Sequence, residues 1–166
     1  MSETPKEEQK LPEREKRVAD YIVAKFGEDV IITEIKPRRI KVKIKPDSIV
    51  NAAKYFKTEL KLDHVESVSG VDYPDDNEIE VVYHIGTYER EDMRDMVIAL
   101  AARISRDEPK IQTLTNIWPS VEYDERETYE MLGVIFEGHP KLERLILPED
   151  WDDIPPLRKD FKNPGR

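Results

Sequence analysis

One segment of the chain alternates strictly between aliphatic residues and lysine, and a second has an apolar residue at every other position. This pattern requires a fold that contains a half-buried β-sheet. Within residues 40–45 every second residue is aliphatic and the others are lysine, and within residues 79–85 four apolar side chains share one face. The apolar positions are Ile40, Val42, Ile44, Ile79, Val81, Tyr83 and Ile85. A period of two places such side chains on the core face of a strand. We interpret the lysine face as the solvated side of an edge strand, and a phosphate-binding stripe is the less favoured alternative.

Other patterns surround these segments with further strands and with helices. Residues 13–26 and 49–60 carry apolar residues at helical spacing, and Gly27 supplies a stop after the first. Two strands are expected within 29–46, and a hairpin within 64–88 that turns at 74–77. Residues 96–106 fit a buried helix or a buried strand, and we favour a strand because no helix-starting cap precedes them.

The second half of the chain contains one more predicted helix and then loses its periodicity. Residues 121–132 are expected to form a helix that ends at Gly133, with Val121, Thr128, Tyr129 and Leu132 facing inward. A short extended piece at 134–136, a turn at 138–140 and a brief apolar element at 142–147 follow. The prolines beyond this point favour an extended segment.

The chain length and composition predict one domain with two flanking segments. A chain of 166 residues supports one core. We expect a disordered charged tail at 1–12, an α/β domain at 13–138, and an extended C-terminal docking arm at 139–166. Such an arm is ordered against its own domain or against another subunit, and Trp151 and Phe161 are its expected anchors.

The charge and the absence of cysteine exclude several functional classes. A formal net charge of −9 argues against binding to nucleic acid or to an anionic membrane surface. No cysteine is present, which removes disulfides, cysteine nucleophiles and cysteine-ligated zinc or Fe–S sites. No apolar run approaches the roughly 20 residues that span a bilayer, and the polar N-terminus lacks a signal peptide's apolar stretch. We therefore expect a cytoplasmic protein, and the scarcity of glutamine and cysteine favours a thermophilic source.

The cluster Glu125-Arg126-Glu127 is the strongest candidate for a functional site. On a helix, Arg126 lies one turn from Glu122 and from Glu130, so an ion-pair ladder on a solvated face is the favoured interpretation. Paired carboxylates acting as general acid and base are one alternative, and an interface site is the other.

The histidines, serines and glycines do not form a recognisable active site. His139 precedes a proline and is expected to fix a turn, and His64 and His84 lack neighbours at metal-ligand spacing. The sequence shows no hydrolytic triad, phosphate loop or dinucleotide fingerprint. We therefore predict no catalytic, cofactor-binding or metal-ligating residue.

Several motifs together resemble the C-type subunit of respiratory NADH dehydrogenase (complex I) and the equivalent small subunits of membrane-bound NiFe hydrogenases and related ferredoxin-driven complexes. The similarity covers about residues 30–162. The residues that carry it are Glu125 to Phe136, Gly138-His139-Pro140, Leu142, Arg144, Leu145, Leu157 to Phe161, Gly70 to Pro74, Val82-Tyr83-His84 and Trp118-Pro119.

The resemblance implies a single α/β domain of the α+β type, with a mixed sheet flanked by helices, that binds no cofactor. It implies docking beside a large (D-type) catalytic subunit and a B-type Fe–S subunit, on the cytoplasmic side of the cell membrane. Fe–S clusters, and NiFe in the hydrogenase branch, would belong to those partners, and the chain's end at Arg166 implies a separate large subunit. The expected partner interface comprises Glu125, Arg126, Glu127, His139, Pro140, Arg144, Trp151, Arg158, Lys159 and Phe161.

Two departures from the family pattern refine this expectation. The family usually has Asp where this chain has Glu130, and an aromatic residue where it has Leu132. These variants favour a non-catalytic assembly subunit of an ion-translocating, NiFe hydrogenase-type complex. The alternatives are a complex I-type or archaeal quinone- or methanophenazine-linked dehydrogenase, a soluble adaptor, and a free-standing carboxylate-pair hydrolase.

Overall fold

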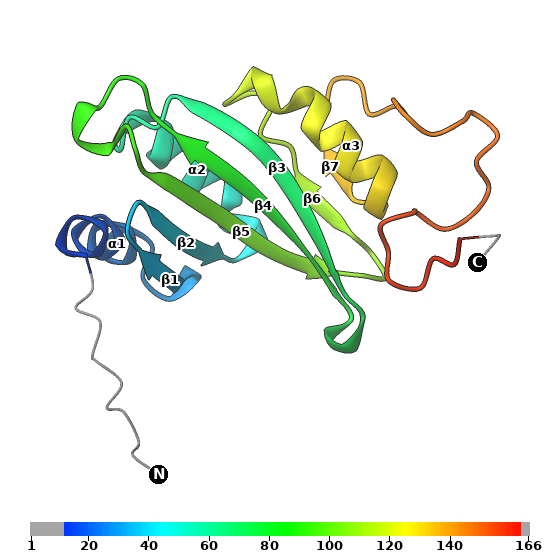
Figure 1. The fold of residues 1–166 in the computed structure, drawn as a ribbon, viewed down its shortest axis with the longest axis horizontal. Helices are drawn as coiled ribbons and strands as arrows, with labels where there is room; N and C mark the ends of the chain where they lie inside the picture. Colours follow the sequence, from blue (N-terminus) through cyan, green and yellow to red (C-terminus); the bar gives the residue numbers. More distant parts are fainter. Residues whose placement is uncertain (1–11, 164–166) are drawn as a thin grey trace, which may run out of the picture.

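The computed structural model describes residues 12–163, so the tail expected at 1–12 lies almost wholly outside the described residues. Three α-helices and seven strands follow one another in this part of the chain (Figure 1). Their order is α1 (Glu13–Phe26), β1 (Val30–Lys36), β2 (Arg39–Ile44), α2 (Ile49–Thr58), β3 (His64–Tyr73), β4 (Glu78–Gly86), β5 (Val97–Ser105), β6 (Lys110–Gln112), α3 (Glu122–Leu132) and β7 (Ile135–Glu137). The fold is a single α+β domain with a mixed sheet, as the sequence predicts.

The main sheet contains five strands in the order β1-β2-β5-β4-β3. All neighbouring pairs are antiparallel except β2 and β5, which are parallel, and β6 pairs with β7 in a separate parallel sheet. The ambiguous segment at 96–106 is therefore confirmed as a strand. The expectation that the lysine-bearing strand is an edge strand is wrong, because β2 pairs on both sides.

The core lies between one face of this sheet and the helices. Figure 1 shows α2 behind the sheet and no helix in front of β4 and β5. Residues of α1, α2 and α3 share one apolar cluster with the inward side chains of β2, β4 and β5. The four apolar residues predicted for one face of β4 are fully buried there: Ile79, Val81, Tyr83 and Ile85. The opposite face of the sheet contains only a small buried cluster of its own.

Helix α3 packs closely on β3 because one position of the strand has no side chain. A Cβ placed on Gly70 would lie 2.1 Å from Leu132 Cδ1 and 3.2 Å from Thr128 Cγ2. The helix ends at Gly133, as predicted, in the left-handed conformation (φ 80°) that favours glycine. A Cβ on Gly133 would also lie 3.0 Å from an Arg158 side-chain nitrogen. Glycine therefore brings α3 against the sheet at one point and the C-terminal arm against α3 at another.

The described part of the C-terminal arm, residues 139–163, contains no helix or strand. It leaves the domain beside α3 and returns to it (Figure 1). Beyond the turn at His139, its attachments to the domain lie in two regions, at Glu143–Leu147 and at Leu157–Asp160. Of the two options left open for this arm, packing on its own domain is thus realised, through turns and bends. The brief apolar element expected at 142–147 is a loop in which Leu145 and Ile146 are exposed, whereas Leu142 and Leu147 are partly buried.

Candidate partner-docking site

Arg126 of α3 binds backbone carbonyl groups of the C-terminal arm. Its side chain is nearly buried (6% exposed), its Nε donates to the Glu143 carbonyl at 2.9 Å, and a terminal nitrogen donates to the Arg144 carbonyl at 3.3 Å. Among the described residues Arg126 forms no ion pair with Glu122 or Glu130. The predicted ion-pair ladder on a solvated helix face is therefore wrong for this residue.

Glu130 accepts hydrogen bonds from three successive backbone N–H groups of the same arm. The donors belong to Leu145 at 3.1 Å, to Ile146 at 2.9 Å and to Leu147. Successive N–H groups that converge in this way form an anion-binding nest. The carboxylate is buried (4% exposed), so it acts as the centre around which the loop turns. We call residues 143–147, fixed by Arg126 and Glu130, the 143–147 loop.

Glu125 lies inside the domain and connects α3 to the sheet and to the segment before α3. Its side chain is completely buried, and it accepts hydrogen bonds from the Tyr83 hydroxyl at 2.8 Å, from the Leu114 backbone N–H at 2.9 Å and from the Thr113 hydroxyl. Burial raises the pKa of Glu125, and the hydrogen bonds only partly oppose this effect. Its side chain does not reach the surface of this chain, whereas Glu127 beside it is exposed, as a solvated helix face requires.

His139 fixes the turn between β7 and the arm, as predicted. Its Nδ1 accepts a hydrogen bond from the Lys141 backbone N–H at 3.0 Å, and its Nε2 lies 3.0 Å from the Glu122 carbonyl oxygen. Since one ring nitrogen accepts, the other carries the proton and donates to Glu122. Pro140, next to it, is exposed.

The second attachment of the arm is centred on Asp72 of β3. Its carboxylate is buried, pairs with Arg106 at 2.8 Å and accepts the Lys159 backbone N–H at 2.8 Å. Arg106 also pairs with Asp160 at 2.7 Å, and Arg158 Nε donates to the Leu132 carbonyl at 2.7 Å. Burial tends to raise the pKa of Asp72, but the hydrogen bonds from Arg106 and from the Lys159 N–H outweigh it, and the net pKa is lowered. These contacts hold the end of the arm against the C-terminus of α3.

The predicted anchors of the arm contact each other. The rings of Trp151 and Phe161 lie 5.7 Å apart between centroids, and both side chains are half-buried. Arg144 is exposed and donates to the Pro148 and Glu149 carbonyls. A hollow of about 150 Å³ opens between the arm and α3, lined by Tyr129, Glu130, Gly133, Arg144, Leu147, Trp151, Asp153 and Pro155.

The arm exposes four aliphatic side chains that are not among the expected interface residues. Ile146 is 63% exposed, Leu157 58% and Leu145 42%, and Ile154 is also exposed. The backbone around Ile146 is fixed by Glu130, and the backbone N–H of Leu157 donates to the Met131 carbonyl at 2.9 Å. Exposed apolar side chains on a fixed backbone are typical of protein interfaces. Two of these residues, Leu145 and Ile146, belong to the run at 142–147, for which only a brief apolar element was expected.

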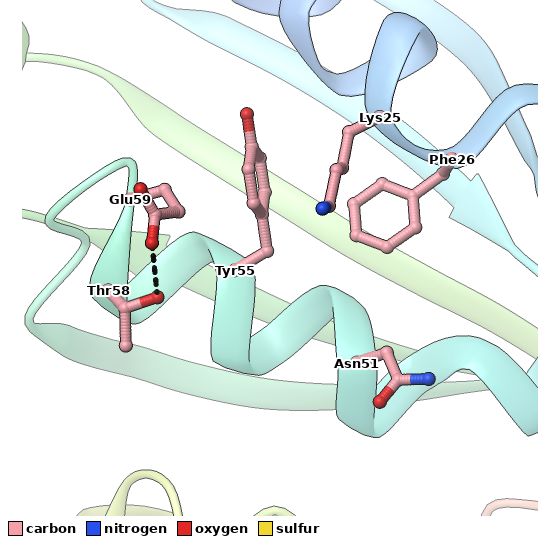
Figure 2. Close-up of a pocket in the computed structure, with 6 residues that line it drawn as sticks. All are labelled: Lys25, Phe26, Asn51, Tyr55, Thr58 and Glu59. Carbon is pink, nitrogen blue, oxygen red and sulfur yellow. Dashed lines mark hydrogen bonds between the residues drawn. The ribbon is translucent and has the colours of Figure 1, made fainter.

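A hollow of about 550 Å³ lies between α1 and α2. Figure 2 shows its lining, with Tyr55 between Lys25 and Glu59, and with Thr58 donating to Glu59. The edge of the Phe26 ring meets Tyr55 at 5.5 Å between centroids. This hollow contains one carboxylate and no histidine, so it has no acid–base pair for a hydrolase.

On α3, burial and the charge of Glu127 raise the pKa of the half-buried Asp124.

No group of three His, Asp or Glu side chains within residues 12–163 could hold a metal ion. No helix in the same range is both long and apolar enough to cross a membrane.

Comparisons with known proteins identify relatives that match most of the chain. Residues 42–166 match the family described as respiratory-chain NADH dehydrogenase, 30 kDa subunit. The C-type subunit of the F420H2 dehydrogenase of Methanosarcina mazei is 38% identical, over 87% of this chain and 90% of that protein. The C-type subunit of the NADH-quinone oxidoreductase of Roseiflexus sp. RS-1 is 39% identical, over 73% of this chain and 68% of that protein.

Two solved structures share the fold. A chain of the membrane-bound sulfane sulfur reductase, an archaeal respiratory membrane complex, is 27% identical and superposes with a TM-score of 0.77 over 90% of this chain and 86% of that chain. A trypsin-resistant fragment of Nqo5 is 23% identical, with a TM-score of 0.64 over 78% of this chain and 99% of the fragment.

Proposed function

Since the chain belongs to the family of the 30 kDa (C-type) subunit of respiratory-chain NADH dehydrogenase, and is thus a subunit of a complex I-type respiratory complex, we propose that it acts there as a non-catalytic assembly subunit. Its contribution is to dock on the large, D-type catalytic subunit and beside the B-type Fe–S subunit. The complex is membrane-bound and ion-translocating, and this chain lies on its cytoplasmic side and reaches the membrane only through its partners. Fe–S clusters, and NiFe in a hydrogenase, are carried by those partners.

The observation that carries the proposal is the way in which the motif residues hold the C-terminal arm. Arg126 and Glu130 bind the backbone of the 143–147 loop, and Asp72 and Arg158 fix the end of the arm. A loop whose backbone is already ordered loses little conformational entropy when it binds a partner. Four aliphatic side chains then project from this fixed backbone into solvent. The buried charges position the surface, and the exposed aliphatic residues contact the partner.

The predicted interface residues therefore divide into two groups under this proposal. Glu125, Arg126, His139 and Arg158 act from inside the chain, through the hydrogen bonds given above. The exposed side chains are available to the partner directly: Glu127, Pro140, Arg144 and Lys159, together with the outer faces of Trp151 and Phe161.

Two types of complex are candidates for the assembly. A NiFe hydrogenase-type complex is favoured by the two departures from the family pattern in α3, which are Glu130 and Leu132. A dehydrogenase of the complex I type is favoured by the 38% identity to the F420H2 dehydrogenase relative, which extends over 90% of that protein. Nickel analysis of the purified complex, with H2 evolution and F420H2 oxidation measured in parallel, distinguishes them.

The docking role is tested by purifying the tagged chain from detergent-solubilised membranes and identifying its partners by mass spectrometry. Ile146→Asp places a charge at the most exposed aliphatic side chain of the arm, and Tyr21→Asp is the matched control on α1, where the side chain is 59% exposed. We expect Ile146→Asp to reduce recovery of the large subunit about tenfold or more with an unchanged melting temperature, and Tyr21→Asp to leave recovery unchanged. Equal recovery with both variants would show that the arm is not the docking surface.

A further inference from the structure

The face of the main sheet that is opposite the helices has small, buried alanine residues at its centre. Ala99 and Ala101 of β5 lie on this face and are fully buried, although no helix covers them. Lys41 of β2 pairs with Glu80 of β4, and β5 lies between these two strands. The long Lys41 side chain therefore crosses β5 above the alanines. Because the alanines of β5 are small, the Lys41 side chain can extend along the sheet surface to reach Glu80.

The β1–β2 half of this face carries excess positive charge, in a chain whose net charge is −9. Lys36 and Arg39 share a single carboxylate, that of Glu34. Lys43, two residues beyond Lys41, belongs to none of the ion pairs among residues 12–163. The pKa of His84, on the same face, is lowered mainly by burial and then by Arg39 and Lys41, with Glu66 opposing, which agrees with a positive local potential.

An apolar side chain and a hollow accompany this charge. Ile31 of β1 is the register partner of Lys43 and is 61% exposed, a large value for an isoleucine in a strand. A hollow of about 180 Å³ lies beside this pair and extends toward Arg103. Its lining contains Lys43, Lys45 and Arg103 and also Glu28, Asp29 and Glu78. Asp29 pairs with Lys45 and Glu78 pairs with Arg103, so among the basic groups of this lining Lys43 is the one that forms no ion pair within residues 12–163 and can pair with an incoming carboxylate.

We propose that the β1–β2 half of the uncovered sheet face, centred on Ile31 and Lys43, docks an acidic segment of another protein in the same complex. The positive charge of the patch favours carboxylates of the partner segment. Ile31 and the hollow beside it favour an apolar residue in the same segment. Anionic lipid and nucleic acid are less suited, because the net charge of −9 on the chain repels both. The patch faces away from α3, so the site adds a second contact to the docking surface proposed above.

Carbodiimide cross-linking tests the proposal in the purified complex. This reagent joins a lysine amine directly to a carboxylate with which it is in contact. We expect peptides in which Lys43 or Lys36 is joined to an Asp or Glu of a partner subunit. Their absence, with linkage found elsewhere in the same complex, would overturn the proposal.

A matched pair of variants gives an independent measurement. Lys43→Glu reverses the central charge, and Lys54→Glu reverses an exposed lysine on α2. In salt titrations of the detergent-solubilised complex we expect Lys43→Glu to reduce retention of one partner at least about fivefold and Lys54→Glu to have no effect. Equal retention overturns the proposal, and so does a Lys43→Glu effect confined to phosphatidylglycerol vesicles or to duplex DNA. Loss of partners by Ile146→Asp is scored separately, so the two docking surfaces can fail independently.

Discussion

Arg126 and Glu130 lie one turn apart on α3 and bind successive parts of one loop with opposite chemistry. The Arg126 guanidinium donates to the carbonyls of Glu143 and Arg144, and the Glu130 carboxylate accepts the N–H groups of the next three residues. Each charge is satisfied by backbone groups of the arm rather than by the other charge. A pair that would form a surface ion pair on an isolated helix here fixes the shape of a loop.

Replacing Glu130 by Gln is therefore expected to release the 143–147 loop without unfolding the domain. Glutamine has the same shape but offers one acceptor oxygen, and its NH2 group faces backbone donors. Loss of charge-assisted hydrogen bonds of this kind costs about 2 kcal/mol. By hydrogen exchange, amide protection at residues 145–147 should fall roughly thirtyfold, while protection in β4 and β5 stays unchanged.

Glu127→Gln is the control for this prediction, because Glu127 lies on the same helix and is exposed. It should leave protection of the loop unchanged. If both variants behave alike, or if Glu130→Gln lowers protection in β5 equally, the loop is not held by Glu130 in the way the structure indicates.

The contact between Gly70 and Leu132 gives a second prediction, for the stability of the domain. A Cβ on Gly70 would lie 2.1 Å from Leu132 Cδ1, so Gly70→Ala must displace the buried Leu132 side chain or move α3 away from β3. Overpacking of this kind costs about 1–3 kcal/mol in the free energy of unfolding, measured with urea. Leu132→Ala alone should also destabilise, because it leaves a cavity. The double variant should be less destabilised than the sum of the two, since the cavity accepts the added methyl group. Simple additivity would show that the two residues do not compete for the same space.

Most of the sheet could be predicted from the sequence because its pattern is local. The alternation in β2 depends only on which face each side chain takes, and the burial pattern of this strand confirms it. In β4 the four predicted apolar residues are buried, but Glu80 and Val82 on the other face are buried as well. The predicted position of β2 at the edge of the sheet was wrong, because lysines on one face do not show which strands pair with its two edges. The parallel pairing with β5 joins segments more than fifty residues apart, and no short-range pattern encodes it.

Some residues of the candidate site could be recognised from local sequence patterns, but their partners in the fold could not. Glu125 and Arg126 were recognised as candidate site residues and Glu130 only as an ion-pair partner of Arg126, because helix spacing suggested solvated ion pairs. Their actual partners are backbone groups of the arm and, for Glu125, the segment before α3 and Tyr83 of β4. Backbone donors and acceptors are present at every residue, so the sequence cannot indicate which of them a buried charge will bind. The thermophilic source and the identity of the partner subunits stay predictions.

The ion pair between Asp72 and Arg106 predicts how the end of the arm responds to pH. The pKa of Asp72 is lowered below its ordinary value of 3.8, so its contribution to stability is present above that value and is lost as the pH falls through the lowered pKa. Asp72→Asn should remove this contribution at neutral pH, and trypsin should then cleave after Arg158 and Lys159 several-fold faster. Asp76→Asn, at an exposed ion pair in the β3–β4 turn, is the control and should not change the rate. Below about pH 3.8 the wild type and Asp72→Asn should converge in the hydrogen-exchange protection of residues 157–160, and a constant difference would contradict this account.

Glu125 predicts the opposite pH dependence, because its pKa is raised. Its neutral form suits the buried site, so its contribution to stability is present below its ordinary pKa of 4.5 and is lost as the pH rises through the raised value. Glu125→Gln keeps a neutral side chain of the same size at every pH. In urea unfolding, the free energy of the wild type minus that of Glu125→Gln should therefore decrease as the pH rises above about 4.5. Glu149→Gln, at an exposed position, is the control: the free energy of unfolding of the wild type minus that of this variant should not change with pH. An increase with pH for Glu125→Gln would mean that the hydrogen bonds from Tyr83, Thr113 and Leu114 outweigh burial and that the carboxylate is the form the fold stabilises.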